Sequence, residues 1–95
     1  MVAIARAMIR DARLILLDEP FEGLAPLIVH DLMAVCRTLA EQGRTIVLVE
    51  QNVHAALKMA HRCYLLNNGH LVFSGSTAEL EAKPEVMSRY LGVAA

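Results

Sequence analysis

Two short apolar runs, each followed by polar residues, predict neighbouring strands. Leu14 to Leu17 (LILL) is followed by the polar residues 18–19 and a proline, and Thr45 to Val49 (TIVLV) is followed by residues 50–52 (EQN). Runs of this length, rich in aliphatic and β-branched residues, are typical of strands in a parallel sheet with both faces covered. We therefore expect two parallel strands that are buried on both faces.

The stretch between these strands has apolar positions at helical spacing, with polar residues on the other side. This predicted buried stripe comprises Ile28, Leu32, Val35 and Leu39. Pro26 suits the first turn of the helix and Gly43 its C-terminal stop. A strand, a helix and a second strand in this order predict a right-handed βαβ unit.

The second half of the chain has the pattern of a hairpin. Cys63 to Leu66 and Leu71 to Phe73 are apolar runs that flank Asn68-Gly69, and Asn-Gly between apolar runs is a strong hairpin signal. Together with the βαβ unit, this predicts an α/β fold whose sheet is mostly parallel and ends in a β-hairpin.

Short helices are expected around these strands. Residues 1–12 lack Gly and Pro and are rich in good helix formers, and a further short helix is expected over residues 53–60. Ser76 and Glu79 have the spacing of a capping box, which predicts a helix over residues 77–82. Pro84 begins a last short helix that ends near Leu91.

Composition excludes several classes of protein. The 95 residues are 56% hydrophobic and 20% charged, with a net charge of −1; this is too apolar for disorder and lacks the basic field of a nucleic-acid-binding protein. No apolar run approaches the roughly twenty residues of a membrane span. Arg6 and Arg10 interrupt the N-terminal stretch, so it does not read as a signal peptide. Cys36 and Cys63, without a CxxC motif, are expected to be reduced and buried.

Candidate chemistry lies at the strand ends, because ligands of parallel α/β sheets bind beyond the carboxyl ends of strands. Asp18 and Glu19 follow the first strand. One carboxylate can hold Mg²⁺, directly or through water, while the next orients or deprotonates an attacking water. The pattern by itself is equally compatible with two solvated loop acids. Glu50 and Asn52, after the second strand, are expected to be ordinary turn residues. The four histidines show no metal-ligand spacing: His30, His54, His61 and His70.

The motifs in combination resemble a known family. LILLDEP, a loop ending in LAP, TIVLVEQN about 20 residues further on, and an Asn-Gly hairpin ending in Ser74-Gly75 are similar to the nucleotide-binding subunits of ABC transporters. The resemblance covers residues 1–95, which look like the C-terminal portion of one P-loop ABC-type ATPase domain. It implies ATP and Mg²⁺ as cofactors.

The resemblance also implies roles for individual residues. LILLDE would be the Walker B strand, with Asp18 as the Mg²⁺ residue and Glu19 as the catalytic carboxylate. Residues 20–24 would be the D-loop, whose Glu22, Gly23 and Leu24 touch the opposite subunit. The opening MVAIARAM is similar to the helix after the family signature. The signature, the glutamine loop and the phosphate-binding GxxxxGK[ST] do not occur in the 95 residues, so Met1 is expected to be an internal methionine.

Two positions depart from the common family pattern. The aspartate that usually precedes the helix is Ala25, which loses about 1 kcal/mol of N-terminal capping. The switch histidine is replaced by Gln51. Glutamine can donate an amide N–H to a γ-phosphate but cannot take up a proton, so Gln51 keeps the hydrogen-bonding part of a catalytic role.

EPFEGLAP, VEQN and the tail STAELEAKPEVMSRYLG are similar to an ATPase subunit of branched-chain amino-acid importers. This implies an ATPase that acts in a dimer with a second ATPase subunit. It would dock from the cytoplasm on membrane permease subunits, with a substrate-binding protein delivering the cargo. Two alternatives stay open: a truncated, non-catalytic piece with at most an interaction role, and a soluble ABC-type ATPase of DNA repair or translation, in which EQN would be unexpected.

Overall fold

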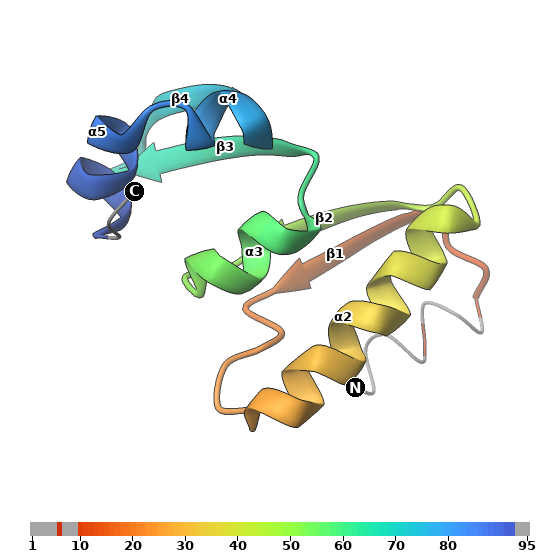
Figure 1. Ribbon diagram of the computed structural model, residues 1–95. Helices are drawn as coiled ribbons and strands as arrows, with labels where there is room; N and C mark the ends of the chain where they lie inside the picture. The colour runs from red at the N-terminus through yellow and green to blue at the C-terminus, as the bar shows by residue number, and fades with distance from the viewer. Residues whose placement is uncertain (1–5, 7–9, 93–95) are drawn as a thin grey trace. The chain divides into compact units, whose positions relative to one another are not determined.

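The computed structural model describes residue 6 and residues 10–92, which form two compact units (Figure 1). The N-terminal unit lies within residues 1–59 and the C-terminal unit within residues 60–95. The elements in order are β1 (Leu14–Asp18), α2 (Pro26–Glu41), β2 (Thr45–Val49), α3 (Val53–Met59), β3 (Arg62–Asn67), β4 (His70–Ser76), α4 (Thr77–Glu81), α5 (Pro84–Val86) and η1 (Met87–Leu91). No helix among the described residues is long and apolar enough to cross a membrane.

The N-terminal unit is built on the predicted strand–helix–strand pattern. β1 pairs in parallel with β2, with Leu14 opposite Thr45 and Asp18 opposite Val49. Helix α2 connects the two strands and runs alongside them (Figure 1). Because the strands are in register, both end at the same edge of the sheet.

The core of this unit lies on one face of the sheet. Ile15 and Leu17 point to this face and are buried with Phe21 and residues of α2. On the other face Leu16 is 70% exposed and Val47 44%. The expectation that both faces are buried is therefore wrong for the described residues, because side chains alternate along a strand and the described helices α2 and α3 pack on one side.

The buried face of helix α2 is rotated slightly about the helix axis from the face that the sequence predicted. Its buried residues are Leu32, Met33, Cys36 and Leu39. Val35 lies at the border of this face, and Ile28, in the first turn, is 40% exposed. Ala25 is the N-cap and makes no side-chain capping bond, as predicted. Gly43 follows the helix at φ +88°, a conformation that favours glycine, so the predicted stop is confirmed.

The C-terminal unit begins with the predicted hairpin, in which β3 and β4 pair antiparallel. Asn68 and Gly69 form the turn at φ +50° and +78°, the left-handed values that make Asn-Gly suitable there. These strands form a two-stranded sheet, and β1 and β2 form another.

The helices of the C-terminal unit also follow the sequence pattern. Ser76 Oγ accepts the backbone N–H of Glu79 at 3.0 Å, and Glu79 Oε1 accepts that of Ser76 at 3.2 Å. The predicted capping box is therefore confirmed at the start of α4. The last predicted helix has the expected extent, but its second half, η1, is a π-helix.

The remaining predictions concern the N-terminal residues 1–12 and the two cysteines. Most of the helix expected over residues 1–12 lies outside the described residues; Arg10 donates its backbone N–H to Arg6 at 3.0 Å, and both side chains are exposed. The two cysteines are not disulfide-bonded. Cys36 is buried, and burial raises the pKa of its thiol, whereas Cys63 is half-buried.

Candidate functional site

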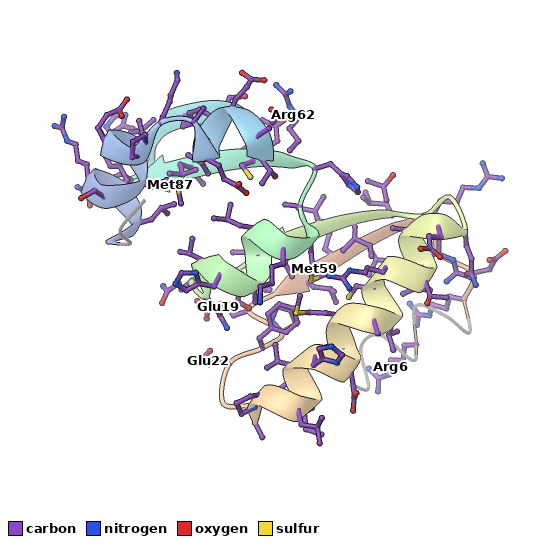
Figure 2. The ribbon with its side chains drawn as sticks, viewed as in Figure 1. Arg6, Glu19, Glu22, Met59, Arg62 and Met87 are labelled. Atoms are coloured by element: carbon purple, nitrogen blue, oxygen red, sulfur yellow. The ribbon has the colours of Figure 1, made fainter. Side chains whose placement is uncertain are left out.

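A hollow of about 260 Å³ lies where β1 and β2 end. It is lined by Glu19, Phe21, Glu22, Glu50, Gln51 and Asn52. Glu19 and Glu22 both come from the loop between β1 and α2 (Figure 2). Gln51 comes from the loop after β2, so the parallel register brings the two predicted catalytic residues, Glu19 and Gln51, to one site.

The backbone of Glu19 is held firmly at the edge of the sheet. Its N–H donates to the carbonyl oxygen of Val49 at 2.6 Å, which continues the β1–β2 pairing by one residue. Glu19 adopts φ +47°, a left-handed conformation that few residues other than glycine take. The chain therefore turns sharply at this position, and the carboxylate of Glu19 faces the hollow instead of continuing the alternation of the strand.

Negative charge accumulates around Glu19. The pKa of its carboxyl is raised above 4.5, first by a hydrogen bond with Glu22 and by repulsion from that residue's charge. Loss of hydration and the charges of Asp18 and Glu50 raise it further. A cation would relieve this repulsion, whereas a phosphate group on its own would be repelled.

Asp18 lies apart from the hollow. In the strand register it is opposite Val49, on the exposed face that also carries Leu16, and its side chain is exposed. Asp18 and Glu19 are adjacent in sequence, yet only Glu19 lines the hollow. The structure therefore does not place both consecutive acids at the hollow; Asp18 influences Glu19 only through its charge, which raises the pKa of the Glu19 carboxyl.

The predicted D-loop forms a compact turn after β1. Glu22 donates its backbone N–H to Glu19 at 3.3 Å, and Leu24 donates to Phe21 at 3.2 Å. Gly23 lies between them at φ +72°. Glu22 lines the hollow, whereas Gly23 and Leu24 are exposed outside it, where another chain can reach them.

Glu50 and Asn52 are more than ordinary turn residues, and here the prediction was incomplete. Glu50 Oε1 accepts the backbone N–H groups of Gln51 at 2.9 Å and Asn52 at 3.0 Å, while Oε2 accepts that of Phe21 at 3.3 Å. Asn52 Oδ1 accepts the N–H of Ala55 at 3.3 Å, at the start of α3. Asn before a helical stretch is a recognisable cap signal; no sequence signal pairs Glu50 with a residue 29 positions away.

The donor set suits Mg²⁺ in chemistry but does not form a complete cage. In the described part of the chain, no three His, Cys, Asp or Glu side chains are arranged to hold a metal ion. Mg²⁺ is usually held by one or two protein carboxylates, with water and substrate phosphates completing the shell. Asp18 and Glu19 carry carboxylate oxygens of this kind at the end of β1, although only Glu19 lines the hollow, and the raised pKa of Glu19 reflects negative charge that a cation would offset.

Comparison with known proteins gives a consistent class. No family model matches the chain. It is 45% identical over 92 residues to the high-affinity branched-chain amino acid transport ATP-binding protein BraG of Pseudomonas aeruginosa, covering 97% of the chain and 40% of BraG. It is 35% identical over 91 residues to the lipopolysaccharide export system ATP-binding protein LptB of Escherichia coli K12, covering 96% of the chain and 38% of LptB.

Solved structures agree with these relatives. An ATP-binding cassette of an ABC transporter in its ADP conformation superposes with a TM-score of 0.77 and 26% identity, over 95% of the chain and 37% of that structure. The cbiO1 protein of Clostridium perfringens, part of an ABC transporter complex, gives a TM-score of 0.75 at 25% identity, over 93% of the chain and 37% of that structure.

The α/β fold is that of part of an ABC ATPase cassette, as the sequence predicted. The chain is a homologue of ABC transporter ATP-binding proteins, BraG and LptB among them, and spans about two fifths of their length.

Proposed function

We propose that this chain is part of the ATP-hydrolysing subunit of an ABC transporter. The observation that carries the proposal is the position of Glu19 and Gln51 on one hollow at the carboxyl ends of β1 and β2, in a homologue of ABC transporter ATP-binding proteins. The reaction is hydrolysis of the β–γ bond of ATP, which depends mainly on positioning and charge stabilisation.

Each residue of the site has a distinct role in this proposal. Glu19 orients the attacking water and accepts its proton, and the raised pKa of its carboxyl suits a general base. Gln51 donates its side-chain amide N–H to the γ-phosphate. Asp18 holds Mg²⁺ directly or through water. When bound with ATP, Mg²⁺ neutralises phosphate charge that the acidic hollow would otherwise repel.

The cargo proposed is branched-chain amino acids. The chain is 45% identical to BraG, whose name states this transport, and 35% identical to LptB of Escherichia coli. In this proposal the subunit works at the cytoplasmic face of the membrane, paired with a second ATPase subunit and docked on permease subunits. A substrate-binding protein supplies the cargo, and no nucleic acid is involved. Glu22, Gly23 and Leu24 form the contact with the second subunit.

Lipopolysaccharide export is the second candidate, because several relatives are LptB proteins at 35–37% identity. A strain lacking its branched-chain importer ATPase, complemented with the complete protein, distinguishes the two. Recovery of labelled leucine uptake supports import. Rescue of a strain depleted of LptB, without recovery of uptake, contradicts it.

The catalytic assignment is tested by Glu19→Gln in the complete protein that contains this chain. The amide keeps the shape of the side chain but cannot accept the proton of water, so we expect ATP binding to persist and turnover to fall by about 10²-fold or more. Asp18→Asn should instead weaken Mg·ATP binding. Glu41→Gln, at the exposed end of α2, is the matched control. Near-normal turnover of Glu19→Gln would show that Glu19 is an ordinary loop acid.

The 95-residue chain itself is expected neither to bind nor to hydrolyse ATP appreciably. Its sequence contains no GxxxxGK[ST] loop to surround the phosphates with N–H groups and a lysine. Calorimetric titration with Mg·ATP measures this. Micromolar affinity would contradict this expectation. It would also contradict the interpretation that residues 18–19 need a phosphate-binding loop to bind ATP.

A further inference from the structure

The carboxylate of Glu50 joins the two loops that carry the proposed catalytic residues. Its Oε1 accepts the backbone N–H groups of Gln51 and Asn52, at 2.9 and 3.0 Å. Its Oε2 accepts the N–H of Phe21 at 3.3 Å, across 29 residues of sequence. One side chain thus binds the loop after β1 and the loop after β2 at once.

The short segment from Glu19 to Phe21 is hydrogen-bonded at both ends, to Val49 in β2 and to Glu50 directly after it. At one end Glu19 donates to the carbonyl of Val49 at 2.6 Å. At the other end the N–H of Phe21 is held by Glu50, while the Phe21 ring is 3% exposed and packed in the core. The left-handed backbone of Glu19 lies between these two anchors.

We infer that Glu50 is a positioning residue for ATP hydrolysis, holding Glu19 and Gln51 at a fixed separation across the hollow. The inference rests on the proposed function. Reacting groups must be held close to their productive geometry, and a displacement of about 1 Å can cost about 10²-fold in rate. Glu50 acts through Glu19 and Gln51 and is not itself assigned any contact with ATP.

The chemistry of the tether requires a carboxylate of this length. Both oxygens of an ionised carboxylate accept hydrogen bonds, whereas a glutamine amide offers one acceptor and one donor group. In Glu50→Gln the –NH₂ group therefore faces a backbone N–H, and one of the two loops is released. Glu50→Asp keeps the negative charge and both acceptors, but it is one methylene too short to hold Gln51 and Phe21 together.

The experiment compares Glu50→Gln and Glu50→Asp in the complete protein, with Glu41→Gln as control. We expect kcat to fall about 10-fold or more in both Glu50 variants, with KM for ATP changed less than about 2-fold. Hydrogen exchange should quicken at the amide of Phe21, Gln51 or Asn52 while β1 and β2 stay protected. Should Glu50→Gln lose that protection and unfold, Glu50→Asp provides the same comparison.

A combined variant separates positioning from an independent effect. Because Glu50 acts through Glu19 and Gln51, adding Glu50→Gln to a protein that already carries Glu19→Gln and Gln51→Ala should lower kcat by less than about 2-fold further. A full additional 10-fold loss, or a normal kcat for Glu50→Asp, would overturn the inference, since the latter would show that charge alone matters. If Glu19→Gln reduces turnover but neither Glu50 variant does, the inference fails and the proposed function stands. If Glu19→Gln retains turnover, the proposed function itself fails, whatever the Glu50 variants show.

Discussion

Each of the two units is stabilised internally, and the contacts within them differ in how far apart in sequence the joined residues lie. In the C-terminal unit the hairpin turn and the capping box each join residues three or fewer positions apart, at Asn68-Gly69 and at Ser76 with Glu79. In the N-terminal unit the parallel strands pair at a distance of 31 positions, and Glu50 reaches Phe21 across 29. In the C-terminal unit the longest of the contacts are shorter, such as the bond from Thr77 Oγ1 to the carbonyl of Ala60, 17 positions away. The proposed chemistry lies in the unit with the longer-range contacts, because these bring the ends of separate parallel strands together.

This difference predicts that the stability of the N-terminal unit depends mainly on the side chains packed in its core. Leu32 in α2 is 1% exposed, and Leu32→Ala should lower the free energy of unfolding by about 2–5 kcal/mol. Leu27, in the same helix but 71% exposed, gives the matched control Leu27→Ala, which should cost far less. Denaturant unfolding of the chain measures both.

Site-resolved hydrogen exchange sharpens the same prediction. In Leu32→Ala the amides of β1 and β2 should lose protection, while those of β3 and β4 keep theirs. Equal loss of protection in both units would show that they unfold together, and would remove the distinction between them.

Local patterns predicted most of the secondary structure in both units. The strands, the hairpin at Asn68-Gly69 and the capping box at Ser76 were all read from residues close in sequence. The sequence also placed Glu19 and Gln51 just after two predicted parallel strands, and in the structure both line one hollow where these strands end.

Features set by distant residues were not predictable in this way. The contact of Glu50 with Phe21 depends on the geometry of two loops, and the position of Glu19 at the hollow depends on the left-handed turn of its own backbone. The exposed face of β1 and β2 depends on which elements cover the sheet, and a run of four apolar residues does not contain that information.

That exposed face gives the second prediction. Leu16 and Val47 lie opposite one another on it, both substantially exposed, so the 95-residue chain should bind a hydrophobic dye and self-associate. Leu16→Thr keeps the preference for a strand and should weaken association by about 1.5–3 kcal/mol, the value of burying one leucine. Sedimentation at several concentrations measures this.

Leu27→Thr is the control for that experiment, since Leu27 is equally exposed but lies on α2. A similar drop in association for Leu27→Thr would show that apolar surface in general, and not the face of β1 and β2, drives self-association. A concentration-independent monomer in the unchanged chain would contradict the prediction directly.

The third prediction concerns the local contacts of the C-terminal unit. Ser76→Ala removes the acceptor for the N–H of Glu79 and should destabilise the unit by about 1 kcal/mol. Ser88→Ala, at an exposed position of η1, should have little effect. Hydrogen exchange of the α4 amides measures the loss, and an equal loss for the two variants would show that the capping box contributes nothing particular.

The smallest expected effect is a difference in how the two units respond to acid. The pKa of Glu79 lies below 4.5, because hydrogen bonds with the backbone and side chain of Ser76 favour the ionised form. Its contribution to stability is therefore present above pH 4.5 and is lost as the pH falls through the lowered pKa. The pKa of Glu19 lies above 4.5, because Glu22 and other acids disfavour its charge.

The sign for Glu19 is consequently opposite. A raised pKa in the folded state means that protonation favours folding, so acidification through that pKa towards 4.5 should stabilise the N-terminal unit slightly. Further acidification below 4.5 should then weaken α4 in the C-terminal unit. Carbon-13 shifts of the two carboxyl groups give both pKa values, and hydrogen exchange of β1 and α4 gives the stabilities. Glu19→Gln should abolish the first response and Glu79→Gln the second. Titration of both carboxyls on the same side of 4.5 would contradict this, because the crowding of acids at the strand ends and the capping of α4 must move a carboxyl pKa in opposite directions.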